Sequence, residues 1–179
     1  MYTCEKKCCP VQIVEYPYAS FSRSSSHLRR GNCRKAGVFI FDPEQNRVLL
    51  VQSRGHLWGP PKGSLEIERG ETSCECAIRE VKEETGLDVK ATEFTRATKI
   101  KNRSIYYYLE KKACRVDIQD LTENDANGIT WIKLDCLEEC IESGKIVLNQ
   151  HAKIVFKRFL GRTFPKSDFV EVKRRRPRR

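Results

Sequence analysis

The chain has 179 residues and a formal net charge of +10, from 34 Lys and Arg against 24 Asp and Glu. Its 39% hydrophobic content suits one domain with a sizeable core, and no apolar run is long enough to cross a membrane. The first ten residues lack the apolar stretch of a secretory signal. We therefore expect a cytoplasmic protein, with the nucleus as the alternative, that makes no membrane contact and favours polyanionic partners.

Residues 1–34 are predicted to form a flexible, peripheral N-terminal arm, because Ala19–His27 is rich in Ser and has no periodicity. The chain contains nine scattered cysteines, which we interpret as reduced thiols. Three of them, Cys4, Cys8 and Cys9, could ligate zinc together with Cys33. Their spacing matches no established zinc motif, so the sequence does not favour such a site.

Two strands are predicted at Ala36–Phe41 and Val48–Gln52, and the polar turn Asp42–Arg47 indicates a hairpin. Two prolines and two glycines exclude a helix at Leu57–Gly63, which we expect to be a loop. A helix should then run from about Thr72 to Thr85 and end at Gly86.

Further elements are expected in the second half of the chain. The strands are Glu93–Ile100, Ser104–Glu110 and Ile129–Leu134, with a turn at Asn102 and Arg103 between the first two. Asp135 is the expected N-cap of a helix to about Ser143, and a last helix spans Asn149–Leu160. Strands around a central helix, followed by late helices, predict a mixed sheet between helices, an α/β/α sandwich. The expected domain covers residues 35–165, and residues 166–179 form a basic tail.

The central helix carries Glu80, Glu83 and Glu84 on one face, at positions i, i+3 and i+4. Like charges at this spacing destabilise a helix by about 0.2–0.5 kcal/mol per pair, and a hard divalent cation would remove the repulsion. Arg79 lies beside Glu83 and could hold it by an i,i+4 ion pair. A solvated acidic helix is the alternative interpretation of the glutamates.

Four cysteines, Cys74, Cys76, Cys136 and Cys140, are interpreted as small core or partly buried residues.

The segment GSLEIERGETSCECAIREVKEETGL, from Gly63 to Leu87, closely resembles the signature of the Nudix pyrophosphohydrolases. The matching positions are Gly63, Glu71, Arg79, Glu80, Val81, Glu83, Glu84, Gly86 and Leu87. One departure is that seven residues, not five, separate Gly63 from Glu71, which we interpret as an insertion in the loop Leu65–Gly70. The resemblance implies the Nudix fold and the cleavage of substrates that contain a nucleoside diphosphate linked to another group.

The same resemblance implies a Mg²⁺ or Mn²⁺ cofactor held by Glu80 and Glu84, with Glu83 as a further ligand or as the catalytic base. Arg79 is expected to orient a glutamate. Lys62 and Gly63 lie where a phosphate could bind, although a plain exposed lysine is equally compatible with the sequence. Trp58 could pack under the loop or stack on a base. Family members often carry another acidic ligand before the last strand, where Asp125 and Glu123 are the candidates; a solvated turn is the alternative.

The loop before the central helix is similar to that of two Nudix subfamilies. The run LWGPPKG resembles both diadenosine tetraphosphate hydrolases and mRNA-decapping enzymes, and CAIREVKEETG is very like the decapping form. The basic segments Arg23–Lys35, Lys153–Lys166 and Lys173–Arg179 favour a long RNA, because each neutralised phosphate adds affinity. We therefore predict capped mRNA as the substrate. A dinucleotide polyphosphate or diphosphoinositol polyphosphate hydrolase is the alternative, and a catalytically silent RNA-binding Nudix module is the alternative of another class.

Overall fold

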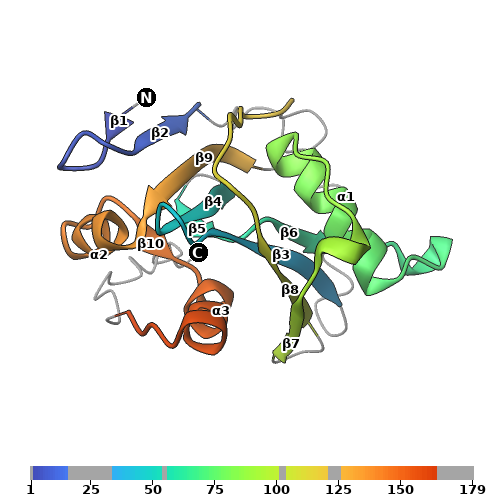
Figure 1. Cartoon of the computed structure of the whole chain (residues 1–179). Coiled ribbons are helices and arrows are strands. Elements are labelled where there is room, and N and C mark those ends of the chain that lie inside the picture. Colours follow the sequence, from blue (N-terminus) through green and yellow to red (C-terminus); the bar gives the residue numbers. More distant parts are fainter. Residues whose placement is uncertain (1, 16–33, 54–55, 101–103, 121–125, 165–179) are drawn as a thin grey trace, which may run out of the picture.

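The computed structural model describes residues 2–15, 34–53, 56–100, 104–120 and 126–164, which form one mixed sheet with helices on both faces (Figure 1). The helices are α1 (Ser73–Thr85), α2 (Leu134–Glu142) and α3 (Gln150–Leu160). The strands are β1 (Tyr2–Thr3), β2 (Pro10–Ile13), β3 (Lys35–Asp42), β4 (Arg47–Ser53), β5 (Leu57–Gly59), β6 (Lys62–Ser64), β7 (Arg96–Ile100), β8 (Ser104–Glu110), β9 (Ala126–Lys133) and β10 (Val147–Leu148). The predicted α/β/α sandwich is confirmed.

The main path of the sheet runs β1-β2-β9-β4-β3-β8-β7. Strand β5 connects β4 to β10, and β6 pairs with β3. The pairs β3–β8 and β5–β10 are parallel, and the other pairs are antiparallel. The sheet is therefore mixed, as the sequence predicts.

Alternate residues of β3 face opposite layers of the sandwich, as the two-residue period of a strand requires. Phe39 and Phe41 belong to the core shared with α2 and α3. Val38 and Ile40 belong to the core under α1. Because both faces of β3 are covered, the strand is almost continuously apolar, and helix α1 lies across the sheet from α2 and α3 (Figure 1).

The predicted hairpin and central helix are confirmed. Antiparallel pairing joins Phe41 to Val48. Helix α1 begins after Thr72, whose hydroxyl accepts a 3.2 Å hydrogen bond from the N–H of Glu75, while the Glu75 carboxylate accepts from the N–H of Thr72 at 2.9 Å. This reciprocal capping box satisfies two N–H groups at the start of the helix. Gly86 ends it with φ of 75°, a left-handed conformation that glycine adopts readily.

The segment Leu57–Gly63 is not helical, but the prediction of a plain loop is wrong. It contains the short strands β5 and β6, separated by Pro60 and Pro61. Backbone groups of β4, β10 and β3 provide their hydrogen-bond partners. The pairing of β5 with β4 is local, but the partners β3 and β10 come from distant parts of the chain, so local composition could not reveal them.

Four other boundaries differ from the predictions. Asp135 is not the N-cap of α2: β9 continues to Lys133, which occupies that position, and Asp135 lies in the first turn. A carboxylate there still interacts favourably with the helix dipole. Strand β9 also begins earlier than predicted, at Ala126, and ends before Leu134. Strand β7 begins at Arg96, after a 3-10 turn at Ala91–Glu93.

The N-terminal segment differs from the expected arm in its first part. Residues Pro10–Ile13 pair with β9, and Val11 is fully buried. Residues 2–13 therefore belong to the sandwich, whereas Ala19–His27, Asn102, Arg103 and the basic run Lys173–Arg179 lie outside the described residues. No helix in the described part of the chain has the length and apolar character that crossing a membrane requires.

Candidate active site

Helix α1 lies against β3 and β6. This contact brings Gly63 of β6 close to the glutamates of α1. A Cβ atom built on Gly63 would lie 1.9 Å from Oε1 of Glu80. Any side chain at Gly63 would therefore displace the Glu80 carboxylate. Glycine is needed here because the strand backbone approaches the carboxylate closely.

Arg79 joins three of the glutamates into one network. Its Nε donates to Glu71 at 2.7 Å, and Nη1 donates to Glu80 at 2.8 Å and to Glu83 at 2.9 Å. Its Nη2 reaches the carbonyl oxygen of Ser64 at 3.1 Å. The planar guanidinium thus fixes the orientation of each carboxylate, which a flexible ammonium could not do. The predicted orienting role of Arg79 has a geometric basis in these contacts.

Glu71 anchors the network at the start of the helix. It accepts hydrogen bonds from Arg79 and, at 2.7 Å, from the N–H of Glu66. The hydrogen bonds from Arg79 are the largest cause that lowers the pKa of Glu71 below its ordinary value, despite the opposing effect of burial. Glu71 is therefore ionised at neutral pH, and Arg79 connects it to Glu80 and Glu83.

Glu84 is held from a different direction. Its Oε2 accepts a 2.8 Å hydrogen bond from the backbone N–H of Lys62 in β6. Glu84 is 3% exposed and Glu80 9%, whereas the Glu83 side chain is 39% exposed. The two predicted metal ligands are therefore deeply placed and fixed, and Glu83 is the most accessible of the three to solvent.

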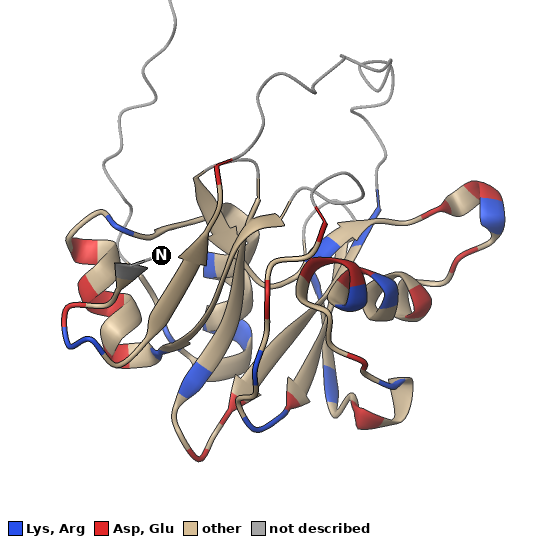
Figure 2. Ribbon diagram, turned by 90° about the horizontal axis from the view of Figure 1, so that it is seen from above, with Lys and Arg blue, Asp and Glu red and all other residues tan. Residues whose placement is uncertain are grey.

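The additional residues between Gly63 and Glu71 extend outward. Ile67–Arg69 forms a 3-10 turn, and Gly70 closes it with φ of 71°. The turn extends beyond the body of the sheet in both views (Figures 1 and 2), and Ile67 is 60% exposed. Because Glu71 still contacts Arg79, the longer loop leaves the network intact.

Tyr106 and His151 form a second polar group near the glutamates, which sequence reasoning missed. Tyr106 Oη and His151 Nδ1 are 3.0 Å apart. Burial raises the pKa of Tyr106, and the charge of Glu84 raises it further. Burial also lowers the pKa of His151, and the charges of Lys62 and Lys35 add to the effect. Tyr106 therefore lies within electrostatic range of Glu84, and the pair links α3 to the site.

The structure describes two of the other predicted site residues, Trp58 and Lys62. Trp58 is fully buried, so it packs beneath the loop and is not exposed for stacking on a base. Lys62 contributes its backbone N–H to the site, and its charge lies close enough to His151 to affect that residue. Glu123 and Asp125 lie outside the described residues.

The fold and the arginine-linked glutamate helix define the class of protein. Residues 31–152 match the NUDIX domain family, so the chain belongs to this family and is a Nudix hydrolase. "Putative hydrolase 111R" of Invertebrate iridescent virus 3 is 34% identical over 134 residues, which cover 74% of this chain and 77% of the viral protein.

Two further relatives have named substrates. The m7GpppN-mRNA hydrolase dcap-2 of Caenorhabditis elegans is 36% identical over 110 residues, which cover 56% of this chain and 14% of dcap-2. The asymmetrical bis(5'-nucleosyl)-tetraphosphatase of Mus musculus is 33% identical over 121 residues, 57% of this chain and 80% of that enzyme. This chain thus resembles only a small part of the decapping relative.

Among solved structures, the bifunctional NMN adenylyltransferase/ADP ribose pyrophosphatase of Francisella tularensis, complexed with AMP and a Mn ion, has a similar fold. Its TM-score is 0.52 at 21% sequence identity, with 72% of this chain and 41% of that chain covered. This similarity supports the fold assignment. Nudix hydrolases as a family depend on divalent metal ions.

Proposed function

We propose that this Nudix hydrolase cleaves a phosphoanhydride bond in the 5' cap of mRNA. The observation that carries the substrate proposal is the 36% identity to a decapping hydrolase over 110 residues, 56% of this chain. The net charge of +10 supports it, because an RNA body offers many phosphates to a basic protein.

The carboxylates fit a Mg²⁺ or Mn²⁺ ion. Both cations prefer oxygen ligands, and Glu80 and Glu84 are nearly buried carboxylates on one helix face. Each has a fixed orientation, given by Arg79 for Glu80 and by the Lys62 N–H for Glu84. A bound ion would screen the charges of the pyrophosphate and lower the pKa of the attacking water.

The protein's own side chains remove the proton from the attacking water and orient the glutamates. Glu83 is the proposed base, because it is the most exposed of the three glutamates and Arg79 holds its Oε2 at 2.9 Å. A base must lie within hydrogen-bond reach of the water proton it removes, so solvent access is necessary. Glu80 is the second candidate for this role. Arg79 is a positioning residue.

Positive charge close to the glutamates suits a polyphosphate substrate. Lys62 and Lys35 both lie near enough to His151 to lower its pKa. The strand pairing explains their proximity, since Gly37 of β3 lies opposite Lys62 and Lys35 lies opposite Ser64. We assign Lys62 and the adjacent Gly63 backbone to phosphate binding. Asp125 is proposed as an auxiliary metal ligand, on the basis of its position in the sequence.

The test compares kcat/KM for a cap dinucleotide with kcat/KM for capped RNAs of increasing length, in low and moderate salt. For a decapping enzyme, kcat/KM rises with RNA length until the basic surface is filled and falls steeply with salt, because binding releases condensed counterions. Deleting Lys173–Arg179 reduces the gain from RNA length and leaves dinucleotide hydrolysis nearly unchanged. The Glu84→Gln variant is the control for contaminating hydrolases.

A small-molecule substrate is the second candidate. It is favoured by the similarity to the Mus musculus tetraphosphatase, of which 80% is covered. Diadenosine polyphosphates and inositol pyrophosphates are therefore included in the same phosphate-release assay. Rapid turnover of one of them, together with no response to RNA length or salt, overturns the decapping proposal. RNA binding without turnover of any substrate indicates a silent RNA-binding module.

A further inference from the structure

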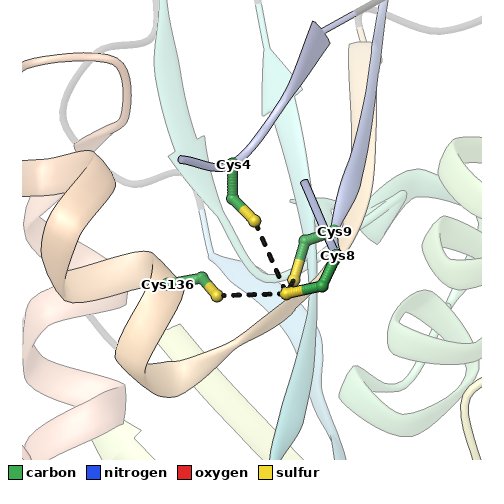
Figure 3. A group of neighbouring side chains, drawn as sticks. All are labelled: Cys4, Cys8, Cys9 and Cys136. Atoms are coloured by element: carbon green, nitrogen blue, oxygen red, sulfur yellow. Dashed lines mark hydrogen bonds between the residues drawn. The ribbon is translucent and has the colours of Figure 1, made fainter. Parts of the chain in front are cut away.

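Four cysteine sulfurs meet at the end of the sheet that lies opposite α1. They belong to Cys4, Cys8, Cys9 and Cys136, and all four sulfurs lie within 4.8 Å of one another (Figure 3). Three come from the loop between β1 and β2, and the fourth comes from the first turn of α2. The sequence suggested Cys33 as the partner of the N-terminal cysteines, but Cys33 lies outside the described residues.

The distances between the sulfurs fit a metal better than they fit a disulfide. Cys8 Sγ lies 3.6 Å from Cys4, 3.7 Å from Cys9 and 3.5 Å from Cys136. A tetrahedral zinc ion with Zn–S bonds of about 2.3 Å separates its sulfur ligands by roughly 3.8 Å. A disulfide bond would bring two sulfurs to about 2.05 Å. All four cysteines are free thiols in this arrangement.

We propose that Cys4, Cys8, Cys9 and Cys136 bind one structural zinc ion. Four thiolates fill a tetrahedral coordination sphere and leave no position for water, so the ion would have a structural and not a catalytic role. Tetrahedral sulfur ligands select zinc over Mg²⁺ and Mn²⁺, which prefer oxygen. The site is therefore chemically distinct from the glutamate helix.

The loop is arranged to direct its three cysteines inward. The N–H of Cys4 donates to the carbonyl of Cys9 at 3.1 Å, and the N–H of Lys7 donates to the carbonyl of Cys4 at 2.9 Å. Lys7 has φ of 54°, a left-handed conformation that tightens the turn. Cys4 and Cys9 are consequently 2% and 0% exposed, and Cys136 is 1% exposed.

Neighbouring groups would stabilise negative charge on the sulfurs. The backbone N–H of Lys133 donates to Cys9 Sγ at 3.4 Å. Cys136 lies in the first turn of α2, where the helix dipole favours a thiolate. Arg47 donates from Nη2 to the carbonyl of Cys8 at 3.3 Å, and its buried Nε has no hydrogen-bond partner among the described residues. A zinc tetrathiolate carries two negative charges, which would compensate this partly buried cation.

The ion would fix the N-terminal hairpin to the rest of the domain. Strand β1 has two residues and β2 has four, and a hairpin of this size is marginal by itself. Zinc would connect the loop of this hairpin to α2, which follows β9 directly. Since β2 pairs only with β1 and β9 in the described sheet, metal binding and the docking of this edge strand should be coupled.

The test measures zinc in the full chain after weakly bound ions have been removed with a mild chelator. We expect about one zinc ion per chain, as a closed four-sulfur site requires. Cys9→Ser and Cys136→Ser should each lower the zinc content at least tenfold. Cys140→Ser is the matched control, since Cys140 is equally buried, lies one turn later in α2 and is not one of the four. Glu84→Gln should retain zinc, which separates this site from the catalytic one.

A second measurement does not depend on the folding of the variants. A mercurial reagent should release zinc from the unaltered protein as its thiols react, and Co²⁺ in place of zinc should give a thiolate-to-metal charge-transfer band. A zinc-free protein with reduced thiols overturns the proposal. So does zinc that persists in the Cys9→Ser and Cys136→Ser variants, or a protein mass that is lower by the two hydrogens of a disulfide.

Discussion

The backbone N–H of Lys62 donates a 2.8 Å hydrogen bond to the side chain of Glu84, 22 residues later. The bond joins β6 to the last turn of α1, and Glu84 is 3% exposed. The glutamate therefore has a structural contact in addition to its proposed metal contact. A substitution that removes the charge but keeps an acceptor oxygen separates these two contributions.

Glu84→Gln should fold normally and lose activity at least ~100-fold, because Gln can still accept from Lys62 but is a much poorer metal ligand. Turnover is measured at saturating Mg²⁺, and circular dichroism reports folding. Glu68→Gln is the control, since Glu68 is exposed on the loop before the helix. Wild-type turnover in Glu84→Gln would remove this residue from the proposed metal site.

Gly63→Ala should displace the Glu80 carboxylate, because the new Cβ would lie 1.9 Å from Oε1. A misplacement of about 1 Å can reduce catalysis on the order of 100-fold. Gly70→Asn is the control: no atom lies within 4 Å of the position of its Cβ, and Asn tolerates the left-handed conformation at φ of 71°. Equal kcat values for the two variants would contradict the importance of the close approach.

Arg79→Lys should lower activity about 10–100-fold, on the scale of losing a residue that orients a metal ligand. The ammonium cannot contact Glu71, Glu80 and Glu83 together, so about 1–3 kcal/mol of unfolding free energy should also be lost. Arg69→Lys is the matched control, because Arg69 forms an exposed ion pair with Glu66. The prediction is wrong if the metal dependence of Arg79→Lys is identical to that of Arg69→Lys.

Asp125→Asn should raise the metal concentration needed for half-maximal activity, by roughly tenfold if the residue is a ligand. Glu123→Gln is the comparison, since it lies in the same acidic loop. A metal titration of both variants distinguishes the two residues. If neither changes the titration, the loop is a solvated turn.

Stability should fall in acid for two reasons that differ in their pH range. His151 has a lowered pKa in the folded protein, so the unfolded chain takes up the proton first, and stability decreases as the pH falls below about 6.5. Glu71 also has a lowered pKa, and its contribution is present above about pH 4.3 and is lost as the pH falls further.

Thermal unfolding between pH 8 and pH 5 tests the histidine contribution. His151→Gln should flatten the decrease in Tm between pH 7 and pH 5, whereas His56→Gln, at an exposed position, should leave the profile unchanged. An unaltered slope in His151→Gln would show that another group titrates in this range.

Local sequence signals predicted α1 almost to the residue. The capping pair Thr72 and Glu75 and the terminal Gly86 act within a few residues of the helix, so a short segment contains all the information. The arginine network could be predicted in part, because the i,i+4 contact between Arg79 and Glu83 is local. Glu71 was identified from its position in the Nudix signature. Its contact with Arg79, eight residues later, could not be predicted from helical periodicity, because Glu71 lies before the helix.

The features that were missed depend on long-range contacts. Strand β2 has only two strongly apolar residues in four, and its pairing with β9 comes from more than 100 residues away. Cys136 is buried in the core, as predicted, but its contact with Cys8 was missed because the two residues are 128 positions apart. Tyr106 and His151 are 45 residues apart and belong to no recognisable pattern. Such contacts are set by packing and not by neighbouring residues in the sequence.

The family match ends at residue 152, inside α3, which continues to Leu160. A protein truncated there would keep every glutamate of the Nudix signature but would lose Phe156 and Phe159, which pack on Phe39. Two aromatic rings removed from a core typically destabilise a domain by about 3–5 kcal/mol each, which is comparable with its whole stability. Inactivity of such a shortened protein would reflect misfolding and aggregation, and it would say nothing about the chemistry of the glutamates.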